Sequence, residues 1–375
     1  MPQSLRFLCL CWIVSLGLSS HAQDVIFNQY FAHRTFVNPA MTGYDGGIHM
    51  ALSNRTQWIG LSGLETGNGA TNRARFNSYM ASLDVDIPCY NLATGGYIVR
   101  HELGQGYYIW QSGGASLAVS LPFGNSNNLR TTEEIRFGVS AHVSNRTLQN
   151  DDFIFSDQLN AITGFDPGLT SGAPAANGNF LNDRPYGDVT AGLMYGRYKN
   201  NQNLRIGFTV HHLLRPQIGL VVDQERLPVR YSTEGIYTWD RGNRSINYTL
   251  MAKVDLQRFS GGFIHRNVQY GVGMSYPYAG STKETGRDAF WWGLYLQTRN
   301  GYPNWRGLTE NISTNTPLLM VGIKNGRSKF SFSYGIPFSG INARSVGTFE
   351  FSFRYYIPKG LSRCCVKKDL LGDQF

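Results

Sequence analysis

The chain has 375 residues, a formal net charge of +9 and only 16% charged residues, against about 25% in ordinary soluble domains, and it is rich in Gly (43), Tyr (21) and Phe (22). Its basic residues are scattered singly, which argues against a nucleic-acid-binding protein and fits arginines in the lumen and at the rim of a barrel. No stretch beyond the N-terminus approaches 18 consecutive apolar residues, which excludes a helical membrane protein, so that any membrane span must consist of strands.

The first residues have the pattern of a secretory signal peptide. Arg6 precedes an apolar run over residues 7–18, and small residues at 20–22 form a cleavage site. The apolar run is shorter than the roughly 20 residues that a helix needs to cross a bilayer. We therefore expect residues 1–22 to be removed on export and the mature chain to begin near Gln23.

Residues 23–46 precede the first predicted strand. They carry four aromatic side chains that must be buried somewhere, at Phe27, Tyr30, Phe31 and Phe36. The run Asn38-Pro39-Ala40 is typical of a turn, because proline fixes φ and the residue before it favours an extended backbone. Two interpretations remain open for this N-terminal segment: a simple lead-in turn, or a periplasmic plug or docking segment.

Beyond residue 46, strict alternation of polar and apolar residues predicts β-strands about ten residues long, the length of a tilted membrane strand. In 135–143, for example, Phe137 and Val139 alternate with Arg136 and Ser140. Such segments predict about fourteen strands, near 47–58, 73–86, 92–101, 107–121, 134–147, 187–199, 203–215, 229–239, 244–256, 261–276, 289–298, 317–324, 328–335 and 346–357.

The polar faces of these strands contain Gly, Ser, Thr, Asn and Arg but few Lys or Glu, which suits a lumen better than a water-exposed sheet. Aromatic residues near strand ends, such as Trp291, Trp292, Tyr355 and Tyr356, are expected to form interfacial girdles. The fold class expected for residues 47–357 is therefore all-β, a transmembrane antiparallel β-barrel of the outer membrane.

An even number of strands places both termini on the periplasmic side. Asn325-Gly326 then predicts a two-residue type I′ turn on that side, and the tail 358–375 is expected there too. Long loops, notably 148–186, are expected on the outside. The connections near 122–133 and 277–288 are long for the periplasmic side.

Three ordered sets of residues resemble the PorP/SprF family of type IX secretion and gliding proteins. The first set is Gln23-Asp24, Phe27, Gln29-Tyr30, Asn38-Pro39-Ala40-Met41-Thr42-Gly43, Arg55, Gln57 and Trp58. The second is Gly207-Phe208-Thr209-Val210-His211-His212, Arg215-Pro216, Arg226-Leu227-Pro228 and Arg230-Tyr231, and the third is the C-terminal strands from Pro317 to Tyr334 and from Thr348 to Tyr356. Together they span nearly the whole mature chain.

The resemblance implies a non-enzymatic outer-membrane component of the type IX secretion and gliding machinery of a Bacteroidetes-type bacterium. It implies as partners the periplasmic ring and lipoprotein components and a large secreted adhesin, besides outer-membrane lipid. The family-motif residues, with a possible docking or plug role, are Phe27, Gln29, Tyr30, Asn38, Pro39, Ala40, Gly43, Arg55, Trp58, Arg226, Leu227 and Pro228. An independent porin-like channel for small solutes is the alternative function.

Patterns that would indicate an enzyme are weak. His142 and His211 lie on predicted luminal faces without a Gly-x-Ser-x-Gly elbow, so a hydrogen-bond network is the expectation. His101-Glu102 lacks the spacing of a zinc protease, and the aspartates of the loop 148–186 match no calcium loop. We expect no catalytic, cofactor or metal site.

Three cysteines follow the predicted signal peptide, at Cys89, Cys364 and Cys365. They are too few and wrongly spaced for a zinc site. Adjacent cysteines rarely bond each other, so their pairing stays open.

Overall fold

The structure is a computed structural model that describes residues 25–58, 62–65, 71–73, 76–104, 108–123, 131–148, 159–160, 164–165, 185–199, 202–218, 226–240, 246–258, 264–277, 289–300, 313–336 and 346–358. The predicted signal peptide, most of the loop 148–186, the connection 278–288 and the tail beyond residue 358 lie outside these residues. Among the described residues, no helix combines the length and the apolar character that a membrane crossing requires.

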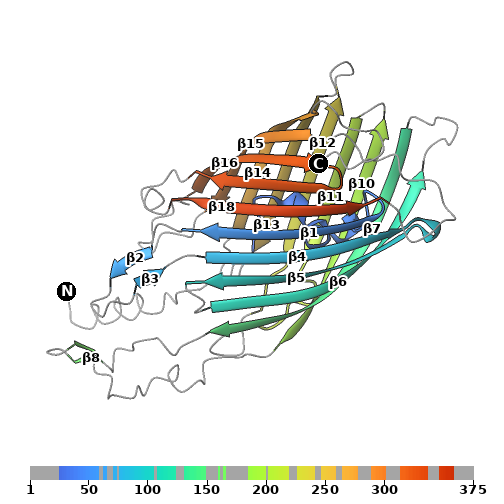
Figure 1. Ribbon diagram of the computed structural model, residues 1–375. Coiled ribbons are helices and arrows are strands. Elements are labelled where there is room, and N and C mark those ends of the chain that lie inside the picture. Colours follow the sequence, from blue (N-terminus) through green and yellow to red (C-terminus); the bar gives the residue numbers. More distant parts are fainter. Residues whose placement is uncertain are drawn as a thin grey trace, which may run out of the picture.

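Fourteen antiparallel strands close into one barrel, which confirms the predicted fold class and strand number (Figure 1). In chain order the barrel strands are β1 (Ile48–Gln57), β4 (Phe76–Ile87), β5 (Leu92–Leu103), β6 (Tyr108–Phe123), β7 (Thr131–Leu148), β10 (Tyr186–Lys199), β11 (Gln202–His211), β12 (Arg230–Asp240), β13 (Asn247–Arg258), β14 (Ile264–Pro277), β15 (Ala289–Asn300), β16 (Ser313–Asn325), β17 (Ser328–Gly335) and β18 (Thr348–Ile357). The first and last strands pair along their whole length, with Ile48 opposite Ile357, so the sheet has no free edge.

Two short hairpins lie outside this sheet, in segments that we expected to be loops. They consist of β2 (Ser62–Glu65) with β3 (Thr71–Arg73), and of β8 (Leu159–Asn160) with β9 (Gly164–Phe165). The helical elements are short: η1 (Tyr30–Ala32), α2 (Arg34–Val37), η2 (Pro39–Met41) and η4 (Pro88–Tyr90).

The barrel strands have an apolar face outside, and most have a polar face inside. In β7, Phe137 and Val139 are 51% and 53% exposed, whereas the intervening Arg136 and Ser140 are buried. Alternation along a strand puts successive side chains on opposite faces, so the exposed apolar face is the one that lipid covers. Arg55, Arg136 and Arg205 are all buried on the luminal side, as their pattern predicted.

The aromatic girdle prediction was wrong for one residue of the Trp291–Trp292 pair. Trp291 lies on the luminal face of β15, is only 7% exposed, and packs edge-on against Phe31. The period-2 pattern requires adjacent residues to face opposite ways, so only one member of a Trp-Trp pair is able to reach the lipid interface.

Two connections also differ from the prediction. Asn325 pairs with Ser328 as the last residue of β16, so the turn is Gly326-Arg327, and of these two residues only Gly326 has a positive φ (+58°). Because a type I′ turn needs positive φ at both central residues, this hairpin is closer to type II′. The long connection near 122–133 is shorter than expected, because β6 extends to Phe123 and β7 begins at Thr131.

We call the end of the barrel that holds Ile48, Ile357 and the Gly326 turn the short-turn end. The opposite end, where the connections after β7 and β15 leave the wall, is the long-loop end. The predicted strand 203–215 is shorter than expected, because β11 ends at His211 and the chain turns away at His212, whose φ is +62°.

Candidate functional site

Residues 25–47 run inside the barrel before β1 begins, and we call them the luminal segment (Figure 1). Every described side chain in it is buried except Ile26 and Phe36, which are half-buried. Buried backbone N–H and C=O groups must find hydrogen-bond partners, and short helical turns satisfy only some of them. The remaining groups of the luminal segment are therefore expected to bond to the barrel wall.

Glu350 on β18 holds the start of the luminal segment. Its two carboxylate oxygens accept the backbone N–H groups of Asn28 (2.6 Å) and Gln29 (2.9 Å). The Gln29 side chain donates to the Glu350 carbonyl (3.1 Å) and accepts from Ser352 (2.7 Å). One wall carboxylate thus pairs two consecutive buried donors, which would otherwise remain unsatisfied.

The turn Asn38-Pro39-Ala40 lies against three glycines of adjacent strands, Gly138 on β7, Gly192 on β10 and Gly207 on β11. A Cβ added at Gly138 would lie 2.3 Å from the Ala40 nitrogen, and one added at Gly192 would lie 2.0 Å from Asn38 Oδ1. Gly138 and Gly192 stand directly opposite each other in the β7–β10 ladder. Side chains are absent here because the turn occupies their space; we call this surface the glycine platform (Gly138, Gly192 and Gly207).

Asn38 uses both ends of its side-chain amide at the platform. Its Oδ1 accepts from the Ala40 N–H (2.9 Å) and so caps η2. Its Nδ2 donates to Glu234 Oε1 on β12 (2.6 Å) and to the Leu193 carbonyl (3.3 Å). An asparagine supplies both a donor and an acceptor in one plane, which neither aspartate nor alanine does.

Arg136 of β7 bonds the backbone that leaves the turn. Its Nε donates to the Ala40 carbonyl (3.0 Å) and its Nη2 to the Thr42 carbonyl (2.5 Å), and the residue has no exposed surface. At the next residue, the N–H of Gly43 donates to Asp84 Oδ1 on β4 (3.0 Å). Gly43 has φ +65°, a conformation that other residues adopt only with strain.

The end of the luminal segment carries an ion-pair network. Asp45 pairs with Arg34 of the same segment and lies 3.8 Å from Arg205 Nη1 on β11. The guanidinium groups of Arg136 and Arg205 lie over the Tyr44 ring, at 5.9 Å and 5.3 Å from its centroid. Buried ion pairs are poor evidence of net stability, but losing one partner would leave a buried charge uncompensated.

His33 lies between two wall hydroxyls. Its Nδ1 is 2.9 Å from Ser82 Oγ on β4, and its Nε2 is 2.7 Å from Ser53 Oγ on β1. Burial, with a smaller contribution from the positive charge of Arg354, lowers the pKa of His33 from 6.5 to about 3. The imidazole is therefore neutral at ordinary pH, and its two nitrogens bond the hydroxyls as one donor and one acceptor.

The opposite wall holds the luminal segment by apolar contacts. Tyr30 and Phe31 pack with a cluster of large side chains from β12, β13, β15 and β16. These are Ile236, Met251, Trp291, Tyr295, Leu318 and Met320. The Phe31 ring also has the guanidinium of Arg354 5.4 Å from its centroid. On this side, large side chains of the wall pack against Tyr30 and Phe31. The contact is between side chains and not between backbones, so the wall needs no glycine platform there.

Two cavities that the described residues form between the luminal segment and the wall are small. One of about 10 Å³ lies among Tyr30, Phe31 and Arg205, and one of about 20 Å³ lies among Phe27, His33 and neighbouring residues. A cavity needs roughly 10–15 Å³ to hold a single water molecule. The space around this part of the segment is thus close to fully packed.

The structure places the family-motif residues in three groups. Seven of them belong to the luminal segment: Phe27, Gln29, Tyr30, Asn38, Pro39, Ala40 and Gly43. Arg55 on β1 faces the lumen, where its Nη1 donates to Gln57 (3.1 Å) and its Nε lies 3.8 Å from Glu350. Trp58, at the end of β1, packs its ring 4.4 Å from that of Phe76.

The motif Arg226-Leu227-Pro228 lies apart from the luminal segment, in the approach to β12. Leu227 is 1% exposed, its N–H donates to the Pro216 carbonyl (2.9 Å), and Gln257 donates to the Pro228 carbonyl (3.0 Å). Arg226 is exposed, and its backbone forms an isolated antiparallel β-bridge with Gln217. These contacts fasten the loop after β11 to the barrel wall.

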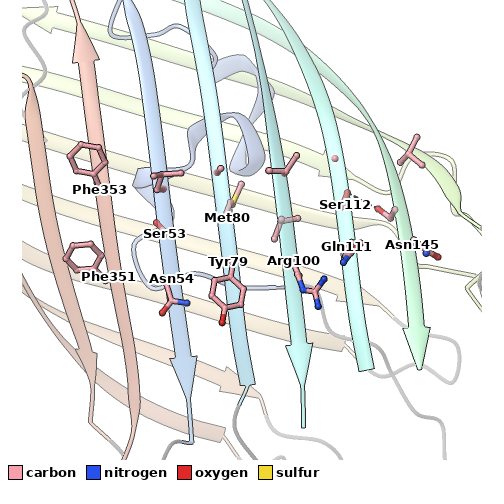
Figure 2. A pocket seen from close by; sticks show the side chains of 17 residues that line it. Ser53, Asn54, Tyr79, Met80, Arg100, Gln111, Ser112, Asn145, Phe351 and Phe353 are labelled. Carbon is pink, nitrogen blue, oxygen red and sulfur yellow. Dashed lines mark hydrogen bonds between the residues drawn. The ribbon is translucent and has the colours of Figure 1, made fainter. Parts of the chain in front are cut away.

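The largest cavity described, about 760 Å³, is a groove on the lipid-facing side of β18, β1, β4, β5, β6 and β7 (Figure 2). Two small residues, Ala81 and Gly113, are among the residues that line it. Outward-facing polar residues line its edge nearest the long-loop end, at Asn54, Tyr79, Arg100, Gln111 and Asn145, which stand opposite one another from strand to strand. The apolar belt ends at this row, since uncompensated charge is disfavoured deeper in lipid.

Sequence analysis expected a luminal hydrogen-bond network around His142 and His211, and the structure gives these two histidines different partners. His211 Nδ1 lies 3.4 Å from the Thr190 hydroxyl, whereas His142 stands directly opposite Asp188 in the β7–β10 ladder. His212 joins His142 and Asp188 in one cluster; sequence analysis named it only within the family-resemblance segment 207–212. Sequence patterns gave little sign of this cluster, because its three residues come from three separate segments of the chain.

The model of the family described as "Type IX secretion system membrane protein PorP/SprF" matches residues 19–355. The chain belongs to this PorP/SprF family. A closed barrel with an apolar exterior, in a family of type IX secretion membrane proteins, makes it an outer-membrane β-barrel of that system. The family match runs from before the luminal segment to the last strand. No curated protein matches the chain.

Several solved structures are similar to the chain at low sequence identity. CdiB from Acinetobacter baumannii has 12% identity and a TM-score of 0.41, over 83% of this chain and 60% of CdiB, so this chain spans less than two thirds of CdiB. A TodX monoaromatic hydrocarbon channel mutant has 11% identity and a TM-score of 0.42, over 86% and 92% of the two chains. A Pseudomonas aeruginosa FadL homologue has 12% identity and a TM-score of 0.40, over 86% and 93%.

Proposed function

We propose that this barrel works as a closed, non-enzymatic scaffold of the type IX secretion and gliding machinery that supports export or surface attachment of a large secreted adhesin. The observation that carries the proposal is the luminal segment. It occupies the lumen, and polar partners from β1, β4, β7, β11, β12 and β18 hold it on several sides.

A porin-like channel is the less favoured function. A porin conducts solutes through a continuous water-filled lumen, whereas here the lumen holds a buried segment with cavities of about 10 and 20 Å³ beside it. Releasing the segment would expose the buried N–H groups that Glu350 pairs and the apolar cluster around Phe31. A hydrogen bond to a charged group contributes about 1.5–3 kcal/mol net, and exposing the apolar cluster to water adds to the cost, so spontaneous opening is disfavoured.

We assign the short-turn end to the periplasm. The luminal segment enters β1 at this end, and the predicted tail 358–375 follows β18 there. Periplasmic ring and lipoprotein components of the apparatus would contact this end. The long-loop end, with Trp58 and the Arg226-Leu227-Pro228 loop, would then face outside and support the adhesin.

Genetic replacement tests the proposed role. Deletion of the gene should abolish surface display of a type IX adhesin, measured by immunolabelling of intact cells, and wild-type protein should restore it. Tagged protein captured from detergent-solubilised outer membranes should retain type IX ring or translocon proteins, or one large adhesin, through a salt wash. Unchanged export and display in the deletion strain, together with recovery of a solitary barrel, would contradict the proposal.

A further inference from the structure

Three side chains that the proposed function does not use meet on the luminal wall towards the long-loop end: His142 of β7, Asp188 of β10 and His212 just after β11. One nitrogen or oxygen from each lies within 4.8 Å of the other two. Asp188 and His212 are buried, and the His142 side chain is 8% exposed. The three residues come from neighbouring segments of the barrel wall.

We propose that His142, Asp188 and His212 bind a transition-metal ion of the zinc class. Asp188 Oδ2 lies 2.6 Å from His212 Nδ1 and 3.7 Å from His142 Nε2. In a tetrahedral zinc site with bonds of about 2.0–2.2 Å, ligand atoms lie roughly 3.3–3.5 Å from one another. Side-chain adjustments smaller than a bond length would bring the three atoms into that arrangement.

The carboxylate is oriented by its second oxygen. Asp188 Oδ1 accepts the backbone N–H groups of Val189 (2.8 Å) and Leu214 (3.3 Å), which leaves Oδ2 directed at the two imidazoles. Hydrogen bonds that fix a ligating carboxylate in this way are typical of metal sites. A hydrogen bond alone accounts for the contact between Asp188 Oδ2 and His212 Nδ1. The distance from Asp188 Oδ2 to His142 Nε2, however, is too long for a hydrogen bond.

The backbone at His212 supports the same interpretation. Its φ is +62°, in the left-handed region that a histidine adopts only at a cost of about 1–3 kcal/mol. The strained turn directs the His212 ring back to the wall just where the chain leaves β11, and the next N–H, that of Leu213, donates to the Val189 carbonyl (3.1 Å). An ion at this point would hold the loop 212–218 against β7 and β10.

The ligand types select the class of ion. Two imidazoles and one carboxylate suit zinc or another borderline divalent transition metal, with water in a fourth position, whereas calcium and magnesium prefer oxygen ligands alone. The loop that the ion would fasten continues towards Arg226-Leu227-Pro228. The site would therefore stabilise one of the loops that we place on the outside of the membrane.

Metal binding by the full-length protein in detergent tests the site. After chelation and dialysis, the protein should bind Zn²⁺ saturably in isothermal titration, and Co²⁺ in its place should give the visible absorption of a four-coordinate ion. Zn²⁺ should raise the melting temperature, while Mg²⁺ and Ca²⁺ should not. His142→Asn and His212→Asn should each weaken Zn²⁺ binding at least tenfold, since two ligands hold an ion poorly.

His101→Asn is the matched control, because His101 is a buried luminal histidine that contacts Ser78 and lies outside the cluster. It should bind Zn²⁺ as wild type does. Far-UV circular dichroism of each variant separates loss of the site from loss of the fold. Absence of saturable Zn²⁺ binding by the wild type, or unchanged binding by folded His142→Asn and His212→Asn, would overturn the proposal.

Discussion

Two sides of the barrel hold the same luminal segment in different ways. On the side of β7, β10 and β11, the turn Asn38-Pro39-Ala40 meets the glycine platform at backbone distance and is fixed by Arg136. On the side of β12 to β16, Tyr30 and Phe31 pack against large apolar side chains. The contact at the glycine platform depends on the missing Cβ atoms of the glycines and on hydrogen-bond geometry. The contact on the side of β12 to β16 depends mainly on buried apolar area.

The same residue type has different uses on the two sides. Glycines of β7, β10 and β11 leave room for the luminal segment. On the other side, Cβ atoms added at Gly271 and Gly293 would lie 2.3 Å and 2.5 Å from the Tyr295 ring, and one at Gly322 would lie 2.2 Å from the Trp291 ring nitrogen. These glycines leave room for the rings of Tyr295 and Trp291, which belong to the wall itself, to lie against the neighbouring strands. The two sides should therefore respond differently to small changes.

The largest effect is expected from one added methyl group on the platform. In Gly138→Ala the new Cβ would overlap backbone atoms of Pro39 and Ala40, which have little freedom to move. Overpacking of this kind costs up to about 3 kcal/mol, so the midpoint of urea unfolding in detergent should fall clearly. Gly187→Ala on β10 is the control, because an added Cβ there meets nothing within 4 Å. Equal midpoints for the two variants would show that the turn does not occupy the platform.

Glu350→Gln tests the wall carboxylate that pairs two backbone donors. Glutamine has one acceptor oxygen, so one of the N–H groups of Asn28 and Gln29 would lose its partner, at a cost of about 1–3 kcal/mol. Protease cleavage within residues 25–47 should become faster as well. Glu133→Gln, which changes a part-exposed pair with Arg197, should have little effect on either measurement. Similar results for both variants would argue against the anchoring role of Glu350.

The pH dependence of stability reports on His33. Because its pKa is about 3 in the folded protein and near 6.5 when unfolded, the unfolded state takes up a proton first as the pH falls. Its contribution to stability is complete above about pH 6.5 and is lost progressively as the pH falls below that value. His33→Gln should lack this component. Parallel stability profiles of the two proteins between pH 7 and 4 would contradict the buried, neutral histidine.

The smallest effect is expected on the apolar side. Met320 on β16 is fully buried in the cluster that receives Phe31. Met320→Leu nearly conserves volume and apolar character, so it should cost no more than about 1.5 kcal/mol and leave protease resistance of residues 25–47 unchanged. A larger loss of stability than in Gly138→Ala, measured under the same conditions, would reverse the comparison between the two sides.

Much of the barrel could be predicted from sequence because strand alternation is a local signal. Each predicted strand corresponds to a barrel strand, and the main errors lie at the ends, as where β16 begins at Ser313 and not near Pro317. The polar start of β7, from Thr131, carries no apolar alternation and was missed. Local patterns also gave no sign of which Trp of the pair at 291–292 faces the lumen.

The path of the luminal segment could not be predicted in the same way. Asn38-Pro39-Ala40 reads as an ordinary turn, and its partners Gly138, Gly192 and Glu234 are distant in sequence and common in strands. The partnership of His142, Asp188 and His212 has the same character, because it depends on strand register and on one left-handed residue. Such contacts become visible only when the register of the closed barrel is known.

Electrical conductance of the purified wild-type protein in a planar lipid bilayer tests the central claim most directly. If the luminal segment closes the barrel, insertion of the protein should produce no steady current across a range of voltages. Steady, ohmic open pores formed by the wild type would contradict a closed scaffold and would favour an independent channel.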